Sequence, residues 1–234
     1  MINVVITGAS KGIGKAIATQ FAAEGAQLFL CARNDVTLYN TVAELQQNYP
    51  NSTINAQAAD MSKKDEVKKF GQWVLDRVAQ IDVLVNNAGQ FLPGNIYNED
   101  DGMLEQMMNT NLYSAYHLTR SFLPLMTDTR KGHIFNISSI AALAAYPNGG
   151  SYSITKFAMM GFNKNLRAEL MQHNIKVTAV LPGAVMTDSW GNFDNINKRI
   201  MEADDIAKMV VAATKLSTQA VVEDIIIRPQ LGDM

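Results

Sequence analysis

The chain has 234 residues, 47% of them hydrophobic, a length and composition that suit a single folded domain over residues 1–234. The formal net charge is -2 at pH 7 and the lysines and arginines are scattered, which argues against a nucleic-acid partner. Cys31 has no second cysteine to pair with, and no zinc-ligand set occurs, so we expect neither an intramolecular disulfide nor a metal site. No apolar run approaches the roughly 18 residues of a membrane span and no leader pattern opens the chain, so we expect a cytoplasmic protein without membrane binding.

Short apolar runs that are typical of buried strands recur along the chain and alternate with amphipathic stretches. The strand-like runs cover residues 2–6, 27–31, 53–58, 82–86, 133–137, 176–181 and 221–227. The helix-like stretches lie near residues 12–24, 35–48, 62–78, 103–126, 151–172 and 204–215. This alternation predicts an α/β fold, a single-domain Rossmann-like doubly wound parallel sheet of about seven strands with helices on both faces.

A glycine-rich turn, TGASKGIG, follows the first strand-like run and opens the first helix-like stretch at residues 7–14. Glycines let the backbone turn sharply and approach a phosphate, and the free N–H groups at a helix start favour an anion. The spacing of Gly8, Gly12 and Gly14 departs from the common G-x-G-x-x-G fingerprint and from the P-loop pattern. Taken alone, the turn is therefore a weak sign of nucleotide binding.

Tyr152 and Lys156 are four residues apart, and Ser139 precedes Tyr152 by thirteen residues. If the segment is helical, residues i and i+4 project from one face, so the ammonium of Lys156 can lie beside the phenol of Tyr152. A free phenol has a pKa of about 10, and a neighbouring cation lowers that pKa by favouring the phenolate. Such a tyrosine can act as a general acid or base. The alternative is an ordinary surface pair, because the pattern Y-x-x-x-K is short.

Several motifs together resemble the short-chain dehydrogenase/reductase family. They are TGASKGIG at 7–14, NNAG at 86–89, Asn111, Ser139, the pair Tyr152 and Lys156, and Pro182-Gly183. They occur in the family's order over residues 2–187, and the chain is most similar to the 3-oxoacyl-[acyl-carrier-protein] reductases and general carbonyl reductases of the family. The resemblance implies an oxidoreductase that moves a hydride between a nicotinamide cofactor and a small carbonyl or alcohol substrate.

The C-terminal sequence VVEDIIIRPQLGDM departs from the glycine-rich ending of the acyl-carrier-protein reductases. A 3-oxoacyl thioester and a broader range of carbonyl substrates therefore stay equally open.

The resemblance also assigns catalytic roles to four residues. Tyr152 is expected to protonate the substrate oxygen as a general acid, and Ser139 to donate a hydrogen bond to the same oxygen. Lys156 is expected to stabilise the phenolate and to hold the nicotinamide ribose. Asn111, on the long helix, is expected to position a water molecule that links Lys156 to solvent.

The turn after the second strand-like run bears on the choice of cofactor. NAD-dependent Rossmann proteins usually carry an acid there for the ribose hydroxyls, whereas an arginine accommodates the 2′-phosphate of NADP. This chain has Ala32, Arg33 and Asn34 at the turn, and Lys11 of the glycine-rich turn can add a second positive charge. We therefore expect NADP(H) rather than NAD(H). The alternative is that Arg33 and Lys11 are solvated surface charges.

Further cofactor contacts follow from the resemblance. Asp60 is expected to accept a hydrogen bond from the adenine amino group, Met61 to pack on the adenine ring, and Val185 to contact the carboxamide through its backbone. Asn86 is expected to be structural. The expected cofactor-binding set is Gly8, Ser10, Lys11, Gly12, Ile13, Gly14, Arg33, Asn34, Asp60, Met61, Asn87, Ala88, Gly89, Tyr152, Lys156, Pro182, Gly183, Val185 and Thr187.

The stretch at residues 187–203 is long for a simple connection and leaves the expected ligand crevice, which indicates a lid over the substrate. Packing of Trp190 and Phe193 against the body of the protein is an equal alternative. The candidates for lining the substrate pocket are Gln90, Phe91, Leu143, Tyr146, Met186, Trp190 and Phe193.

Members of the family commonly form tetramers through their long helices, so a homo-oligomer, either a tetramer or a dimer, is expected. The corresponding stretches 103–126 and 151–172 carry apolar residues that could face a second copy. These are Leu104, Met107, Met108, Met159, Met160 and Phe162. The alternative to an enzyme is a non-catalytic sensor of NADP(H) on the same fold, although a sensor has no need of a proton donor such as Tyr152.

Overall fold

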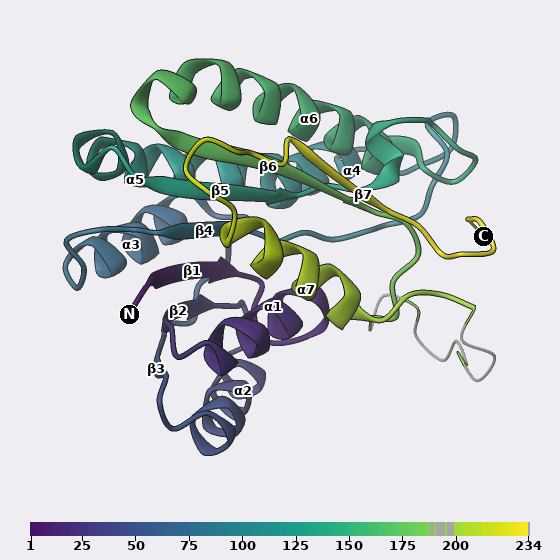
Figure 1. Cartoon of the computed structure of the whole chain (residues 1–234). Helices are drawn as coiled ribbons and strands as arrows, with labels where there is room; N and C mark the ends of the chain where they lie inside the picture. The colour runs from purple at the N-terminus through teal and green to yellow at the C-terminus, as the bar shows by residue number, and fades with distance from the viewer. Residues whose placement is uncertain (188–189, 191–194, 196–198, 234) are drawn as a thin grey trace.

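Parallel strands form one seven-stranded sheet in the order β3-β2-β1-β4-β5-β6-β7 in the computed structural model, which describes residues 1–187, 190, 195 and 199–233. The strands are β1 (Asn3–Thr7), β2 (Gln27–Cys31), β3 (Thr53–Ala56), β4 (Val83–Asn86), β5 (Gly132–Ile137), β6 (Ile175–Pro182) and β7 (Asp224–Ile227). The α-helices are α1 (Gly12–Ala23), α2 (Asp35–Asn48), α3 (Lys64–Leu75), α4 (Met103–Met108), α5 (Ser114–Thr129), α6 (Gly150–Leu170) and α7 (Ala203–Thr214). The doubly wound parallel sheet predicted from the sequence is confirmed (Figure 1).

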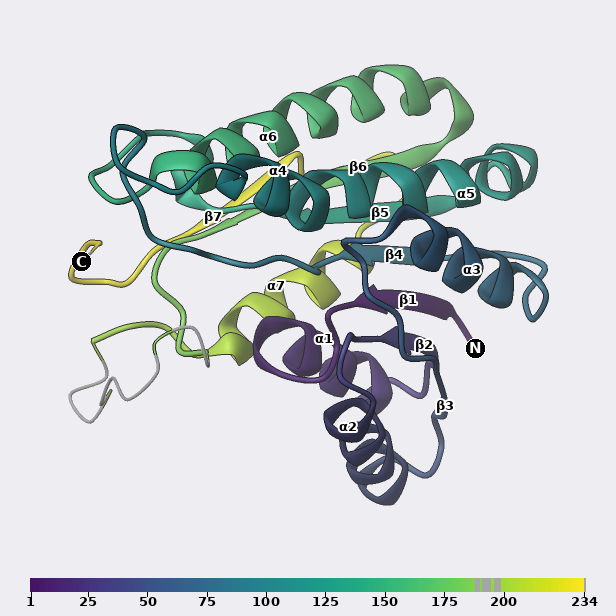
Figure 2. The same cartoon turned by 180° about the vertical axis from the view of Figure 1, so that it is seen from behind.

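The two faces of the sheet are covered by different helices, as the two opposite views show (Figures 1 and 2). Val4 and Ile6 of β1 belong to a buried cluster that also holds residues of α1, α2 and α7. Val5, between them, belongs to a second cluster with residues of α3, α5 and α6. Successive side chains of a strand point to opposite faces, so an uninterrupted apolar run is required when both faces are buried.

The strand order reverses beside β1, which lies between β2 and β4. In open parallel sheets, the connections that leave the carboxyl ends of the strands on the two sides of this point diverge and leave a crevice. The segments that follow β1, β4, β5 and β6 therefore meet at one edge of the sheet, and these segments carry the predicted site residues.

The prediction of a single helix over residues 103–126 is wrong in one respect, because the structure divides this stretch into two α-helices. A π-helical segment, Asn109–Tyr113, separates α4 from α5. A π-turn inserts an extra residue into a helix and shifts the side chains that follow, and such turns are frequent at functional sites. Asn111 lies in this segment and is 1% exposed. Two 3-10 turns, Ile140–Ala142 and Met171–His173, were also not predicted.

A chain of buried asparagines joins the centre of the sheet to α6. The Nδ2 of Asn86 donates to Asn136 Oδ1 at 2.8 Å and to Thr119 Oγ1 at 3.0 Å. The Nδ2 of Asn136 in turn donates to Asn163 Oδ1 at 2.9 Å. Buried amides require such partners, since an unpaired one costs on the order of 1–3 kcal/mol. The expectation that Asn86 is structural agrees with these bonds.

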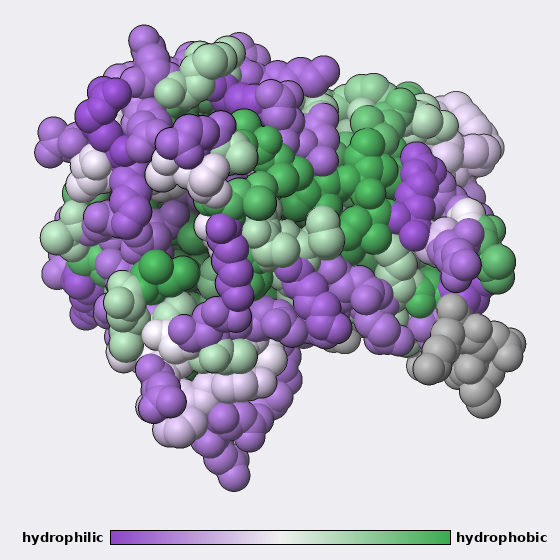
Figure 3. Space-filling model, in the orientation of Figure 1, coloured by the Kyte–Doolittle hydropathy of each residue, from purple (hydrophilic) through white to green (hydrophobic). Residues whose placement is uncertain are grey.

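The last strand leaves an apolar edge on the surface. Figure 3 shows apolar residues gathered over the side of the molecule where α6 and β7 lie. Ile226 of β7 is 52% exposed, and Val221 just before the strand is 41% exposed.

Among the described residues, no helix is long and apolar enough to cross a membrane. No group of three His, Cys, Asp or Glu side chains within the same residues could hold a metal ion. Cys31 is fully buried in β2, and burial raises the pKa of its thiol to about 12.

Candidate active site

The glycine-rich turn after β1 has a backbone that only glycine fits. Gly8 and Gly12 have positive φ angles of 64° and 55°, in the region that side chains with a Cβ rarely adopt. A Cβ at Gly14 would overlap the carbonyl oxygen of Gly8. The turn is also tied to α2, because Thr41 Oγ1 donates to the Ser10 carbonyl at 3.0 Å. The first turn of α1 thus presents its N-terminus at the crevice, as the sequence predicted.

Asn87 fixes the shape of this turn from the end of β4. Its Nδ2 donates to the carbonyl oxygens of Thr7, at 2.9 Å, and of Gly8, at 3.0 Å. In return, Thr7 Oγ1 accepts from the backbone N–H groups of Asn87, at 3.0 Å, and Ala88, at 2.9 Å. The Nδ2 of Asn87 is therefore committed to holding the turn. Thr7 is a member of this network that the sequence reasoning missed.

Positive charge lies at the end of β2, where a phosphate was expected. Arg33 and Lys11 are both exposed. Asn34 was predicted to bind cofactor, but its Oδ1 accepts from Thr37 N at 2.9 Å and caps α2. The side chain of Asn34 therefore has a structural function, while Arg33 stays available in position beside the crevice.

Asp60 and Met61 follow β3, and their side chains lie in different surroundings. Burial acts to raise the pKa of Asp60, but hydrogen bonds from Ser62 and the charges of Lys63 and Arg33 lower it overall. The Asp60 carboxylate accepts from Ser62 N at 3.0 Å and from Ser62 Oγ at 2.7 Å. Met61 is 5% exposed and lies in the core cluster beneath α3. Little of the Met61 side chain is exposed, and its packing on an adenine ring stays a proposal.

Tyr152 lies in the first turn of α6, between a ring and a hydroxyl. The rings of Phe91 and Tyr152 pack edge to face, with their centroids 4.9 Å apart. On the β5 side, a hydrogen bond with Ser139 favours the Tyr152 phenolate. Ser139 itself is held by Ala141 N, which donates to its Oγ at 3.1 Å, and by the Pro182 carbonyl at 3.5 Å. Ser139 and Tyr152 thus come together as the sequence predicted.

Lys156 is buried one turn further along α6 and is 5% exposed. Its Nζ lies 5.4 Å from the centroid of the Tyr152 ring and donates to the Ile137 carbonyl at 3.2 Å. A Cβ at Gly89 would come within 3.9 Å of the same Nζ, so the NNAG motif lies next to the ammonium. The i, i+4 spacing of the sequence therefore places both side chains in the crevice and rules out the ordinary surface pair.

Burial sets the pKa values of this pair. It raises the pKa of Tyr152 to about 12, although the hydrogen bond with Ser139 lowers it, and Tyr146 raises it further. Burial lowers the pKa of Lys156 to about 8. The pKa of Tyr152 is therefore not held below its ordinary value, contrary to the expectation from the sequence, since loss of hydration disfavours the phenolate and is the larger effect. At pH 7, Tyr152 keeps its proton and most Lys156 side chains are charged.

Asn111 joins the segment after β4 to α6. Its Oδ1 accepts from Gln90 N at 2.8 Å, and its Nδ2 donates to Gln90 O at 3.0 Å and to Thr155 Oγ1 at 3.0 Å. Thr155 Oγ1 donates to the Tyr152 carbonyl at 2.7 Å. Both polar atoms of the Asn111 amide are thus engaged with protein. Any role of Asn111 in positioning water stays a proposal.

The segment after β6 returns over the glycine-rich turn. Gly183 N donates to Ile227 O at 2.8 Å and continues the pairing with β7. A Cβ at Gly12 would lie 3.2 Å from Thr187 Cγ2, so Thr187 sits directly over the turn. The indole N–H of Trp190 donates to the Val185 carbonyl at 2.9 Å. Val185 is the residue whose backbone was expected to contact the carboxamide, and this bond uses one acceptor position of its carbonyl oxygen.

The predicted lid falls partly outside the described residues. Phe193 lies outside them, and Trp190 is described on its own. The two ends of the 187–203 stretch are joined, because Met186 N donates to Met201 O at 2.7 Å and Val185 pairs with Met201 in a parallel bridge. The described residues at the two ends of the stretch therefore lie side by side. Closure over a substrate stays a proposal.

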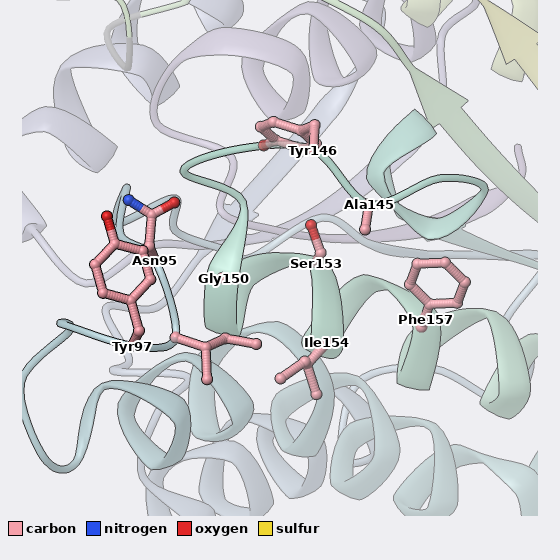
Figure 4. A pocket seen from close by; sticks show the side chains of 9 residues that line it. Asn95, Tyr97, Ala145, Tyr146, Gly150, Ser153, Ile154 and Phe157 are labelled. Carbon is pink, nitrogen blue, oxygen red and sulfur yellow. The ribbon is translucent and has the colours of Figure 1, made fainter.

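A pocket of about 610 Å³ lies at the N-terminal end of α6 (Figure 4). Its lining is Asn95, Ile96, Tyr97, Ala145, Tyr146, Gly150, Ser153, Ile154 and Phe157. Of the predicted pocket residues that the structure describes, Tyr146 alone is among them. Tyr146 also raises the pKa of Tyr152, so one residue of the pocket lies near enough to the phenol to act on it. The other lining residues come from irregular segments or from the N-terminal half of α6, where Ile154 and Phe157 are exposed and Ser153 is buried.

A family model described as short chain dehydrogenase matches residues 3–197. A sepiapterin reductase of Chlorobaculum tepidum is 35% identical over 240 residues, covering 99% of this chain and 97% of that protein. The structure of an alcohol dehydrogenase from Thermococcus sibiricus complexed with 5-hydroxy-NADP has a TM-score of 0.92 and 28% identity, covering 100% of this chain and 99% of that one. A metagenomic short-chain oxidoreductase in complex with NADP has a TM-score of 0.85 and 31% identity, covering 98% and 97% of the two chains.

The crowding at Gly14 gives a test of the predicted phosphate site. Gly14→Ala must displace the turn, because its Cβ would overlap the Gly8 carbonyl and the Asn87 amide. We expect the affinity for NADPH, measured by fluorescence titration, to fall by at least about tenfold, a change of roughly 1.4 kcal/mol. Gly161→Ala on α6 is the matched control, since its Cβ would meet no heavy atom within 4 Å. Equal affinities for Gly14→Ala and wild type would contradict the assignment.

Proposed function

The chain belongs to the short-chain dehydrogenase family, and on that premise we propose that it reduces a carbonyl group at the expense of NADPH, with Tyr152 as the general acid. In the reverse direction, Tyr152 would accept a proton from an alcohol. The observation that carries the proposal is the arrangement at the start of α6, where a protonated phenol lies between Ser139 and the buried ammonium of Lys156.

Each side chain has a defined task in this reaction. NADPH, when bound, supplies the hydride to the carbonyl carbon, which leaves negative charge on the carbonyl oxygen. Ser139 donates a hydrogen bond to that oxygen, and Tyr152 gives it a proton. Tyr152 is suited to this step because burial keeps its pKa near 12, so the phenol is protonated at neutral pH.

Lys156 supplies the positive charge that the step requires. Once Tyr152 has lost its proton, a phenolate is left in a buried site, where an unpaired charge is costly. The Lys156 ammonium faces the ring at 5.4 Å from its centroid and offsets this cost. Its remaining N–H groups are suited to the hydroxyls of a ribose, while one is fixed by Ile137 O at 3.2 Å.

The preference for NADP(H) rests on the end of β2. Arg33 is exposed beside the crevice, and Ala32 takes the place of the acid that would repel a 2′-phosphate. Two solved relatives carry NADP or a hydroxylated NADP, at 31% and 28% identity. Lys11 adds charge at the first turn of α1.

For the substrate, we propose a carbonyl compound with an apolar or aromatic body. The reacting carbonyl would lie at Tyr152 and Ser139, and the body would extend past Tyr146 toward Ile96 and Phe157 in the pocket of Figure 4. Sepiapterin is one candidate, because a 35% identical relative is a sepiapterin reductase. A 3-oxoacyl thioester is another, from the motif resemblance. Both, with simple aromatic ketones, form the first panel for an NADPH oxidation assay.

The surface also supports the proposal of a homo-oligomer, with Phe162 as expected but with other neighbours. Met107, Met159 and Met160 are buried within the chain and cannot face a second copy. A second pocket of about 470 Å³ lies between α5 and α6, lined by Leu112, Tyr113, Tyr116, His117 and Phe162. We propose that a second copy covers this face, and that the β7 edge of Figure 3 offers a further contact. A monomeric mass in light scattering would contradict this.

Replacing Tyr152 by Phe tests the proposed function directly. Only the hydroxyl is removed, so we expect Tyr152→Phe to fold and to bind NADPH with a dissociation constant within about twofold of wild type. Turnover should fall by roughly 10²- to 10⁴-fold, the usual contribution of general acid–base catalysis. Steady-state kinetics with the best substrate of the panel give the measurement. Turnover close to wild type would place the proton donor elsewhere, and NADPH binding without turnover in the wild type would favour the sensor.

The lowered pKa of Lys156 predicts how the rate of reduction depends on pH. A lysine with a pKa of about 8 is charged below that pH and neutral above it. Because reduction needs the charged form, kcat/KM should be level at pH values well below about 8, bend near pH 8, and fall by about tenfold per pH unit well above it. Tyr152 stays protonated throughout this range. A profile that is level up to pH 10 would contradict the role given to Lys156.

The cofactor preference predicts a selective effect of Arg33→Ala. A charge-assisted hydrogen bond contributes about 1.5 to 3 kcal/mol, or roughly ten- to a hundredfold in affinity. NADPH should therefore bind that much more weakly to the variant, while the affinity for NADH changes little. Arg77→Ala, an exposed arginine after α3, is the control and should alter neither value. Wild-type affinities that are equal for NADPH and NADH would refute the preference.

A further inference from the structure

The N-terminus of α6 is capped by a residue from a distant segment. Gly149, at the N-cap position, has no side chain that could accept a hydrogen bond from the first turn. The carboxylate of Glu99 takes this place, because Ser151 N donates to its Oε1 at 3.2 Å and to its Oε2 at 3.4 Å. Ser151 Oγ donates to the same Oε1 at 2.7 Å. A negative charge at this end also complements the helix dipole.

The approach of Glu99 to the helix is close and leaves no room for other side chains. A Cβ at Gly150 would lie 3.1 Å from Glu99 Oε2, and one at Gly94 would lie 3.2 Å from the same oxygen. Gly94 also pairs with Gly149 in a parallel bridge. Two glycines therefore allow the backbones and the carboxylate to meet at the start of α6.

The segment that carries Glu99, residues 90–102, is joined to the start of α6 at further points. Asn148 N donates to Asn95 Oδ1 at 2.9 Å, and Asn95 Nδ2 donates to Asn148 Oδ1 at 2.9 Å. Figure 4 shows Asn95 and Tyr97 of this segment beside the first turn of α6 at Gly150. At its other end, the segment places Phe91 against the ring of Tyr152. The segment thus contacts the first turn of α6 in two ways: Glu99 binds the backbone of Ser151, and Phe91 packs on the side chain of Tyr152.

We propose that Glu99 is a positioning residue for Tyr152, whose carboxylate fixes the first turn of α6 so that the phenol stays aligned between Ser139 and the substrate carbonyl. This inference rests on the proposed function. The inference goes beyond the proposed function because Glu99 touches neither the reacting atoms nor the motifs of the family. Glu99 acts through Ser151. Because Asn95, Ile96 and Tyr97 of the same segment line the pocket, the contact would connect occupation of the pocket to the alignment of the proton donor.

The contact itself is tested without turnover. In hydrogen exchange read by mass spectrometry, Glu99→Gln should speed exchange in a peptide that covers residues 147–157, because Ser151 N loses its charged acceptor. Peptides from α1 and α7 should be unchanged. Glu105→Gln, an exposed acid in the first turn of α4, is the matched control and should change nothing in the 147–157 peptide. Unchanged exchange in Glu99→Gln would overturn the proposal.

Kinetics then separate positioning from a purely structural cap. We expect Glu99→Gln to lower kcat by about ten- to a hundredfold, the effect of a displacement near 1 Å, while KM and the dissociation constant for NADPH stay within about twofold. Ser151→Ala keeps both backbone bonds and loses only the hydroxyl bond, so its kcat should fall less. The double variant should resemble Glu99→Gln, because both changes act on one contact.

The alternative outcomes are distinct. A kcat for Glu99→Gln equal to wild type, or a parallel loss of kcat, NADPH affinity and melting temperature, would show a merely structural residue and overturn the proposal. A wild type without turnover on any carbonyl would instead refute the proposed function, and with it the role of aligning a proton donor, whatever the exchange data show about the contact.

Discussion

The structure depends on keeping the ammonium of Lys156 buried beside the ring of Tyr152. Removing a charged group from water is costly, and the lowered pKa of about 8 is the sign of that cost. The protein offsets it with the Ile137 carbonyl at 3.2 Å and the face of the tyrosine ring. A charge held this way needs a rigid α6, which explains the many bonds to that helix: the asparagine chain below it, the Asn111–Thr155 bond at its side and Glu99 at its end.

The crevice is built from two halves with different chemistry. On the β1 side, Thr7 and Asn87 hold a glycine-rich turn that presents backbone N–H groups, a surface suited to phosphates. On the β5 and β6 side, side chains of α6 carry the proton chemistry. The parallel sheet brings both halves to the carboxyl ends of its strands, where the strand order reverses. The segments that border the pocket lie outside this frame, so substrate choice can vary while the reaction stays the same.

The sequence predicted the features that have a short period or a fixed spacing. Apolar runs gave all seven strands of the described residues within about three residues, and the i, i+4 spacing placed Tyr152 and Lys156 together. Contacts between distant irregular segments left no such signal. The role of Glu99 and the pocket residue Ile96 depend on how residues 90–102 fold against α6. The burial of Met61 and the dominance of desolvation over charge at Tyr152 likewise arise only from the assembled core.

Isotope transfer tests the central claim most directly, namely that hydride moves from the cofactor to a carbonyl carbon while Tyr152 protonates the oxygen. The protein would be given NADPH with deuterium at both C4 positions and the best substrate of the panel, and the alcohol product analysed by NMR and mass spectrometry. The account predicts one deuterium per product, on the former carbonyl carbon, and the same label at a far lower rate in Tyr152→Phe. NADPH oxidation without deuterium on that carbon would contradict the account.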